Sequence, residues 1–412
     1  MAWLYNIGIG IYLRFIRLAA RWYPKAKEWC DGREGLFGAV AAAVAPGERI
    51  VWVHAASLGE FEQGLPVVEA IRAEHPEYKI LLTFFSPSGY GVRKNYAGVD
   101  YVFYLPADTP ANARRFVELV RPEIALFIKY EFWFNMLAEL RRQGVRTYLI
   151  SSIFRRDSIF FRFYGSLWRR MLRCFDTIFV QDGESLRLLG SIGIDSVVVS
   201  GDTRFDRVAR IAETAPRIEL VERFRGGSRL FIAGSVWKED EDILLPFINA
   251  NPSIKFIIAP REMDEMRIAR VCAGVRGGAV RYSRCTPSTS FDDVQVMVLD
   301  TVGLLTSAYG YASWAYIGGG FGVGIHNTLE AAVFGVPTLF GPNHVKFKEA
   351  CDMVKLGAAA AVCDGEDLMR RFVPLRDDAG RLAEAGRRAR EYVLKNRGAS
   401  AVIMQSIFGG AK

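Results

Sequence analysis

A glycine-rich stretch in the last third of the chain contains residue types and spacings that suit a bound nucleotide-sugar. Residues 316–342 are YIGGGFGVGIHNTLEAAVFGVPTLFGP, in which a glycine loop separates a short apolar strand ending at Ile317 from a predicted helix. Glycine allows the backbone to turn sharply and to approach a ligand closely. Asn327 has the spacing of a helix N-cap relative to Glu330. The free N–H groups at such a helix start suit a phosphate, and Glu330 can accept hydrogen bonds from two sugar hydroxyls.

Two other kinds of phosphate-binding loop do not fit this stretch. It does not match the G-x-G-x-x-G pattern of a dinucleotide-binding fold in any register. It also lacks the Lys-Ser/Thr ending of a P-loop. The remaining alternative is a tight turn between two buried elements that binds nothing.

Two carboxylates follow predicted buried strands in the first half of the chain. Glu60 lies in the first turn of the helix predicted after strand 49–54, and Glu131 follows strand 122–128. Because open parallel sheets bind ligands at the carboxyl ends of their strands, both positions belong to a candidate active site. A carboxylate there can act as the general base that deprotonates a sugar hydroxyl. The alternatives are a helix-capping role for Glu60 and a solvated loop position for Glu131.

The segment 154–175 combines six arginines with aromatic side chains and a single acid. The arginines that we select as candidate acceptor or membrane ligands are Arg155, Arg156, Arg162, Arg169 and Arg170. Arginine binds phosphate in a bidentate manner, so an anionic lipid headgroup fits this segment. Nucleic acid bound through stacking and charge fits as well, and a solvated basic helix face is the third alternative. The apolar N-terminus favours lipid.

Residues 4–22 are strongly apolar but include three arginines, so they contain no uncharged run long enough for a membrane span. A signal peptide is disfavoured, because the arginines interrupt the apolar region and no small-residue cleavage site follows. The large apolar side chains share one helical stripe: Leu4, Ile7, Ile11, Phe15, Leu18 and Trp22. We therefore expect a helix that lies in the membrane interface. The alternative is a helix packed on the protein's own core.

Strands and helices alternate along the whole chain, which predicts an α/β protein with parallel, doubly wound sheets. A chain of 412 residues exceeds the usual size of a single core, so two domains are expected. We place a membrane-associated helix at 1–30, an acceptor-binding Rossmann-like domain at 31–206 and a nucleotide-sugar-binding Rossmann-like domain at 207–412. Two such domains that face each other across a central cleft are the usual frame of a nucleotide-sugar transferase.

The composition limits the choice of partners and cofactors. The formal net charge of +8 suits nucleic acid, an anionic membrane surface or a phosphorylated substrate. The six cysteines are scattered without a C-x-x-C pair, which indicates reduced thiols in a cytosolic compartment. Only four histidines occur and none form H-x-x-x-H, so we expect no catalytic metal and no other cofactor.

Five motifs together resemble those of the 3-deoxy-D-manno-octulosonic acid (Kdo) transferases of lipid A assembly, and the similarity extends over nearly the whole chain. The motifs are HAASLGE at 54–60, KYEFW at 129–133, GDTRFD at 201–206, APR at 259–261 and GIHNTLE at 324–330. The resemblance implies two Rossmann-like domains of the GT-B type. It also implies the transfer of Kdo from CMP-Kdo to a lipid A precursor (lipid IVA) at the cytoplasmic face of the inner membrane, with no nucleic acid as a partner.

The resemblance also implies roles for individual residues. Glu60 matches the family's general base, and Glu131 and Arg204 match positions that stabilise the transition state. The residues that match CMP contacts are Pro260, Arg261, Val302, Gly303, Leu304, Asn327, Thr328, Leu329 and Glu330. The family commonly has lysine at the position of Arg204 and often glutamate at that of Leu304. The expected reaction is a direct displacement that inverts the anomeric carbon.

Two other functions compete with this interpretation. The first is a different enzyme of the same fold, such as a UDP-sugar epimerase or lipid A disaccharide synthase. The second is a non-catalytic module that binds anionic lipid or nucleic acid through the arginine-rich segment 154–175. The choice of CMP over UDP separates the first alternative from a Kdo transferase, and transfer activity excludes the second.

Overall fold

The computed structural model describes residues 2–410, which form two compact units. The first unit, here the N-terminal domain, contains the residues up to Arg207 and those from Arg397 onward. The second unit, the C-terminal domain, contains Val208–Asn396. Helix α10 (Thr203–Thr214) crosses the boundary.

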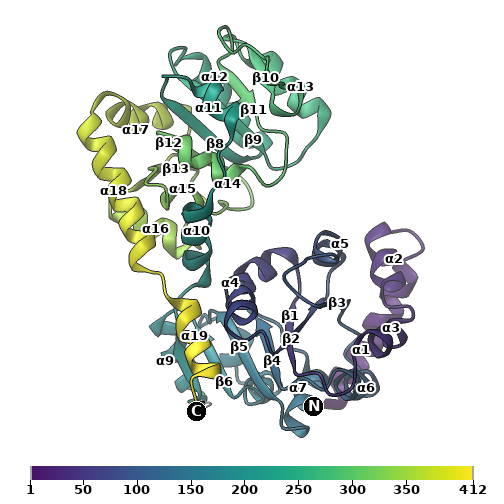
Figure 1. Ribbon diagram of the computed structural model, residues 1–412. Coiled ribbons are helices and arrows are strands. Elements are labelled where there is room, and N and C mark those ends of the chain that lie inside the picture. Colours follow the sequence, from purple (N-terminus) through teal and green to yellow (C-terminus); the bar gives the residue numbers. More distant parts are fainter. Residues whose placement is uncertain (1, 411–412) are drawn as a thin grey trace. The chain divides into compact units, whose positions relative to one another are not determined.

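The predicted extent of the C-terminal domain, 207–412, is wrong at its end, because residues from Arg397 onward belong to the N-terminal domain. The cause is the burial of apolar surface. Helix α19 (Ala399–Phe408) packs against α4 (Leu58–Glu74), and its Ile403, Met404 and Ile407 lie in the core of the N-terminal domain (Figure 1).

A seven-stranded parallel sheet with the order β3-β2-β1-β4-β5-β6-β7 forms the centre of the N-terminal domain. Its strands are β1 (Ile50–Ala55), β2 (Lys79–Phe84), β3 (Tyr101–Tyr104), β4 (Ile124–Ile128), β5 (Arg146–Ser152), β6 (Thr177–Val180) and β7 (Val197–Val199). Strands β1 and β4 are buried along their whole length, as their unbroken apolar runs require in a sheet covered on both faces. The strand order reverses between β1 and β4, and this reversal is the place where open α/β sheets bind ligands.

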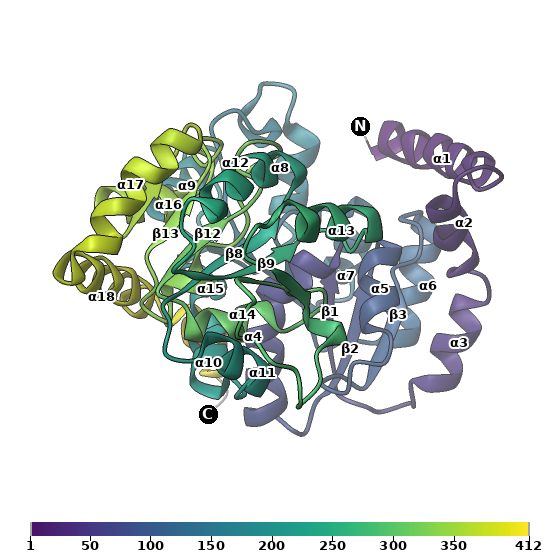
Figure 2. The ribbon, with the colours of Figure 1, turned by 90° about the horizontal axis from the view of Figure 1, so that it is seen from above.

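Helices cover both faces of this sheet (Figure 1). Besides α4 and α19 they are α5 (Pro87–Arg93), α6 (Pro110–Val120), α7 (Phe134–Arg142), α8 (Ser166–Leu172) and α9 (Gly183–Gly190), with a 3-10 turn at Ile159–Phe161. Three further helices, α1 (Ala2–Ala19), α2 (Pro24–Asp31) and α3 (Leu36–Ala43), lie beside α5, α6 and the edge strand β3 (Figure 2).

Helix α1 has no buried residue and is attached to the domain along one side only. Tyr5 donates a hydrogen bond to Asp108 Oδ2 at 2.6 Å, and Asn135 Nδ2 donates to Asn6 Oδ1 at 2.8 Å. The opposite side is apolar and exposed, with Trp3, Leu4, Ile7, Ile11, Phe15 and Leu18 in contact with solvent. Helix α1 thus packs on the domain core along one side, where Ala2 and Tyr5 contact it, while its apolar stripe stays exposed. No helix within residues 2–410 is long and apolar enough to cross a bilayer.

The C-terminal domain repeats the same architecture, with the strand order β10-β11-β9-β8-β12-β13-β14 in a second all-parallel sheet. Its strands are β8 (Leu230–Val236), β9 (Lys255–Pro260), β10 (Ala279–Arg281), β11 (Val296–Val298), β12 (Trp314–Ile317), β13 (Thr338–Phe340) and β14 (Ala359–Ala361). Here the order reverses between β8 and β12. The predicted pair of doubly wound parallel domains is confirmed.

The helices of the C-terminal domain again lie on both faces of the sheet (Figure 1). They are α11 (Glu219–Arg225), α12 (Lys238–Asn249), α13 (Glu265–Gly274), α14 (Leu305–Ala308), α15 (Leu329–Ala332), α16 (Lys348–Lys355), α17 (Gly365–Asp377) and α18 (Ala379–Lys395), with 3-10 turns at Tyr282–Arg284 and Tyr309–Tyr311.

Candidate active site

The two predicted catalytic carboxylates lie at the reversal point of the N-terminal sheet. Glu60 is in the first turn of α4, directly after β1, and Glu131 follows β4, the neighbour of β1. Their charges interact, because the charge on Glu131 raises the pKa of Glu60. Residues that are 71 positions apart in the sequence are thus brought to one sheet edge.

Glu60 is held in a position that suits a general base. Its Oε2 accepts a hydrogen bond from the backbone N–H of Ala56 at 2.7 Å, while Oε1 accepts none within residues 2–410. The alternative of a helix-capping role therefore explains the contact of Oε2 but leaves Oε1 available for a substrate proton. Partial burial raises the pKa of Glu60, and the nearby charge of Glu131 raises it further, whereas the Ala56 hydrogen bond, His54 and Lys129 lower it. A carboxylate whose pKa is moved toward neutrality is a stronger base once it is ionised.

Glu131 is buried within a chain of hydrogen bonds, so the alternative of a solvated loop position is wrong. Its Oε2 lies 2.9 Å from His54 Nε2 and accepts from Trp133 Nε1 at 2.8 Å. On the other side of the imidazole, His54 Nδ1 lies 2.9 Å from Thr83 Oγ1, which accepts from Trp52 Nε1 at 2.8 Å. His54 Nδ1 also lies 3.2 Å from the carbonyl oxygen of Thr83. The imidazole thus links Thr83 to Glu131, and a proton on Nε2 makes its contact with Glu131 a donated hydrogen bond.

His54 and Trp133 contact the candidate catalytic carboxylate Glu131, and the sequence reasoning did not select them although both lie inside quoted motifs. Two donors that converge on one carboxylate oxygen fix its position, because a buried carboxylate without partners is costly. The available signal was a histidine at the end of a fully apolar strand, where an unpaired polar side chain is rare.

Arg204 lies at the start of α10 and forms an ion pair with a neighbour in the same motif. Its Nε and Nη2 donate to Asp202 Oδ2 at 2.8 and 2.6 Å, and Asp202 is buried. The hydroxyl groups of the adjacent Thr203 and of Ser151 are hydrogen-bonded, with Oγ1 and Oγ 2.8 Å apart. The Thr203 hydroxyl also donates a hydrogen bond to the carbonyl of Gln63 in α4. The start of α10 is thereby fixed against the helix that contains Glu60.

The glycine loop follows β12, at the reversal point of the C-terminal sheet. Its glycines serve close packing of backbone segments: a side chain on Gly318 would meet the carbonyl of Ser235, and one on Gly320 would meet Gly341. Gly319 has a φ of +91°, which favours glycine. The loop thus needs glycine for its own packing, in addition to any ligand contact that the sequence suggested.

Asp240 of α12 ties this loop to the end of β8. It is fully buried and accepts from the backbone N–H of Gly319 and of Trp237 and from the hydroxyl of Tyr316, all at 2.8 Å. Asp240 was not among the residues selected from the sequence, because only the fold reveals that β8 and β12 are neighbours.

The predicted nucleotide-binding residues follow three strands that end at the same edge of the C-terminal sheet. Pro260 ends β9 and Arg261 follows it, the segment Val302–Leu304 comes after β11, and Asn327–Glu330 come after β12. Val302 and Arg261 are exposed. The helix that begins here, α15, has only four residues and is shorter than the sequence suggested.

The side chains of this region form a connected polar group. Asn327 Nδ2 donates to Glu330 Oε1 at 3.1 Å, and Thr306 Oγ1 donates to Glu330 Oε2 at 2.9 Å. Thr328 is fully buried, and its Oγ1 has no hydrogen-bond partner within residues 2–410.

His326 lies beside these residues as a neutral acceptor. Its Nε2 accepts from Trp237 Nε1 at 2.8 Å. Burial, and next to it the positive charge of Arg261, lower the pKa of His326 to about 4. His326 is therefore neutral at pH 7.

The arginine-rich segment 154–175 divides into buried and exposed parts. Phe154, Phe160 and Leu167 belong to the domain core, whereas Phe163 is 93% exposed. Arg169 donates to the carbonyls of Phe160 and Arg162 at 2.9 and 2.8 Å, which gives it a structural role in the loop. The exposed members of the predicted set are Arg155, Arg156, Arg162 and Arg170.

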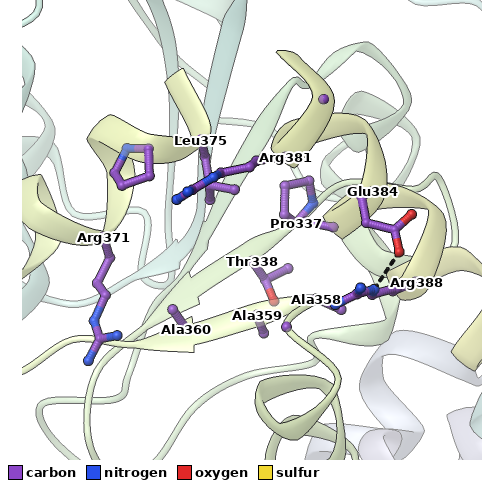
Figure 3. Close-up of a pocket in the computed structure, with 14 residues that line it drawn as sticks. Pro337, Thr338, Ala358, Ala359, Ala360, Arg371, Leu375, Arg381, Glu384 and Arg388 are labelled. Atoms are coloured by element: carbon purple, nitrogen blue, oxygen red, sulfur yellow. Dashed lines mark hydrogen bonds and ion pairs between the residues drawn. The ribbon is translucent and has the colours of Figure 1, made fainter. Parts of the chain in front are cut away.

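A cavity of about 470 Å³ lies elsewhere in the C-terminal domain, between α17, α18 and the starts of β13 and β14. Figure 3 shows Arg388 paired with Glu384 at one side of it, at 2.7 Å. The other two arginines of its wall also have acidic partners, since Arg371 lies 3.4 Å from Asp367 and Arg381 lies 3.3 Å from Asp378. The cavity is at the opposite edge of the sheet from the predicted nucleotide-binding residues.

Two parallel doubly wound domains, with carboxylates at the reversal point of one and a glycine loop at that of the other, define a glycosyltransferase fold of the GT-B class. Solved structures have the same fold. UDP-GlcNAc 2-epimerase from Neisseria meningitidis bound to UDP-GlcNAc matches with a TM-score of 0.63 and 14% identity, over 88% of this chain and 100% of that one. The calicheamicin glycosyltransferase CalG4 matches with a TM-score of 0.53 and 10% identity, over 89% and 99%.

Sequence comparison finds similarity to one family. Residues 31–207 match the family of 3-deoxy-D-manno-octulosonic-acid transferases (kdotransferases). The 3-deoxy-D-manno-octulosonic acid transferase of Bordetella pertussis is 27% identical over 96% of this chain and 97% of that protein. That of Aquifex aeolicus is 27% identical over 79% and 85%. The protein is a glycosyltransferase that is similar to Kdo transferases.

Proposed function

We propose that this protein transfers Kdo from CMP-Kdo to a lipid A precursor, lipid IVA. The observation that supports this most directly is the pair Glu60 and Glu131 at the reversal point of the N-terminal sheet, within residues 31–207, which match the Kdo transferase family. A sugar hydroxyl needs a positioned base to become a nucleophile, and Glu60 has a free oxygen and a raised pKa.

In the proposed reaction, Glu60 removes the proton of an acceptor hydroxyl while the oxygen attacks the anomeric carbon of Kdo. The new C–O bond forms as the bond to the phosphate of CMP breaks, so the proton ends on Glu60 and the electron pair leaves with CMP. The attack from the opposite side inverts the anomeric carbon. Glu131 and Arg204 stabilise charge that develops in the transition state, and Arg261 with the N–H groups at 327–330 binds the leaving CMP.

The decisive experiment incubates the purified protein with lipid IVA and a CMP-Kdo-generating system and reads the product by mass spectrometry. We expect a mass increase equal to one or more Kdo residues. An unmodified acceptor in the presence of an active control transferase would exclude the proposal. Nucleotide protection separates it from a UDP-sugar enzyme of the same fold: CMP should raise the melting temperature, and UDP should not.

We also propose that the protein works at the cytoplasmic face of the inner membrane, to which α1 attaches it. The exposed stripe of Trp3, Leu4, Ile7, Ile11, Phe15 and Leu18 offers a continuous apolar surface, with arginines at its side. The test is sedimentation with vesicles of phosphatidylglycerol and phosphatidylcholine. The double variant Ile7→Glu/Ile11→Glu should remain in the supernatant, whereas Val199→Glu, which alters an exposed valine elsewhere in the N-terminal domain, should bind as the wild type does.

A further inference from the structure

A second pocket of the N-terminal domain lies between α1, α2 and the loop that precedes α6. It has a volume of about 360 Å³. Apolar walls come from Leu13, Trp29, Leu36 and Phe37, and polar groups from Arg17, Arg33 and Glu34. We call it the α1–α2 pocket. Its lining residues do not include Glu60 or Glu131.

Arg33 is the central polar residue of this pocket, and no acidic side chain among residues 2–410 pairs with it. Its three side-chain nitrogens donate to backbone carbonyls: Nε to Leu105 at 2.8 Å, Nη1 to Trp29 at 2.9 Å and Nη2 to Phe85 at 2.9 Å. The guanidinium also lies 3.7 Å from the centre of the Trp29 ring and 4.8 Å from that of Tyr104. Since a guanidinium has five N–H groups, two remain for another acceptor.

The surroundings of Arg33 leave its charge uncompensated. Burial lowers the pKa of Arg33 to about 9, and only tyrosines and a cysteine oppose that effect. Carbonyl dipoles and aromatic faces stabilise a guanidinium less than an anion does, and a buried cation without a counter-ion is costly. This differs from the arginines around the cavity in Figure 3, each of which is paired with a carboxylate.

A second unsatisfied group lines the same pocket. The indole N–H of Trp29 is buried and has no acceptor within residues 2–410. The pocket thus combines a hydrogen-bond donor that lacks an acceptor with a cation that lacks an anion. Arg17 adds a second positive charge from the exposed surface of α1, and Glu34 at the rim is the single carboxylate of the lining.

We propose that the α1–α2 pocket binds the phosphate of a membrane lipid, with Arg33, Arg17 and the Trp29 indole N–H as ligands and the apolar walls around the adjoining acyl chain. Phosphate suits the fork of an arginine and accepts from an indole N–H at the same time. A lipid suits the walls, because Leu13 belongs to α1, whose other face is the exposed apolar stripe. The phosphate site is inferred from the contacts of Arg33 and Trp29 alone. The choice of a lipid as the source of the phosphate rests on the proposed membrane location.

The test uses isothermal titration calorimetry with three soluble probes below their critical micelle concentrations. n-Octyl phosphate supplies the anion and the chain, inorganic phosphate the anion only, and n-octyl glucoside the chain only. We expect n-octyl phosphate to bind at least tenfold more tightly than either of the others. Because no donor or acceptor sugar is present, the result does not depend on whether the protein transfers Kdo.

Matched variants locate the binding. Arg17→Glu should weaken n-octyl phosphate binding about tenfold, whereas Arg14→Glu, a neighbour on α1 outside the pocket, should leave it unchanged. Arg33→Lys keeps a cation but loses the fork, and should weaken binding even where its melting temperature equals that of the wild type. Equal effects of Arg17→Glu and Arg14→Glu would overturn the assignment. If n-octyl glucoside binds as tightly as n-octyl phosphate, the pocket recognises the apolar chain and not the phosphate. If inorganic phosphate binds as tightly as n-octyl phosphate, the chain contributes nothing and a lipid is excluded as the ligand.

Discussion

Replacement of Asp240 by alanine should destabilise the C-terminal domain more than most single substitutions, because one carboxylate satisfies three buried donors. Oδ2 accepts from the N–H groups of Trp237 and Gly319, and Oδ1 accepts from the hydroxyl of Tyr316. The side chain is fully buried. Alanine leaves all three donors without an acceptor.

The magnitude follows from the cost of an unsatisfied buried donor, about 1–3 kcal/mol each. Three such donors give an upper range of about 3–9 kcal/mol, and water that enters the space of the lost carboxylate reduces it, so we expect about 3–5 kcal/mol. Asparagine can direct its oxygen at the two N–H groups and its NH₂ at the Tyr316 oxygen, so Asp240→Asn should cost about 1–2 kcal/mol.

The assay is urea unfolding with a probe specific to the C-terminal domain, since two domains need not unfold together. Hydrogen exchange at the Gly319 amide, measured by mass spectrometry on the peptide that contains it, reports the same contact locally. The Asp240→Ala variant should also lose CMP protection, because the loop that precedes Asn327 is no longer tied to β8. An Asp240→Ala protein within about 1 kcal/mol of wild type, or an Asp240→Asn variant as damaged as Asp240→Ala, would refute the reasoning.

Two further predictions concern the N-terminal domain. The pKa of Glu60 is raised, so the transfer rate should fall as the pH drops through that pKa. Glu131→Gln removes a charge that raises the pKa of Glu60, so it should slow transfer and also shift the acidic limb of the kcat–pH profile to lower pH. An acidic limb that does not move would contradict the coupling of the two carboxylates. Asp206 accepts hydrogen bonds from the N–H groups of Gly398 and Ser400 at 2.6 and 2.7 Å. Asp206→Asn should therefore lower the free energy of unfolding by about 2–3 kcal/mol and speed hydrogen exchange in α19. The control Asp195→Asn, at an exposed position, should change neither quantity.

The fold followed from the sequence to a large extent, because the central buried strands are predominantly apolar runs that end in a turn or at a helix start. The positions of Glu60 and Glu131 after such runs were enough to place them at one sheet edge. The sequence could not reveal which strands are neighbours, and His54, Trp133 and Asp240 owe their roles to that arrangement. Local patterns report on the residues nearby in the chain, whereas these hydrogen bonds join residues 77 and 79 positions apart.

Two features of the structure could not be predicted for the same physical reason. Helix α19 follows α18 in the chain, and its apolar face gave no sign that its partner is α4 in the N-terminal domain. The glycine loop was interpreted as allowing close approach to a ligand, and the structure adds that Gly318 and Gly320 are needed where the loop meets the backbone of Ser235 and Gly341. Both features depend on long-range contacts, of which a single sequence contains no direct record.

The most direct test of the central claim compares Glu60→Gln with wild type in a single-turnover transfer assay with CMP-Kdo and lipid IVA. Glutamine keeps the size and the Ala56 hydrogen bond but cannot accept the proton, so the rate should fall about 10²–10⁴-fold while CMP protection and the melting temperature stay unchanged. A Glu60→Gln enzyme that transfers Kdo at the wild-type rate would show that the proton goes elsewhere and that this carboxylate is not the base.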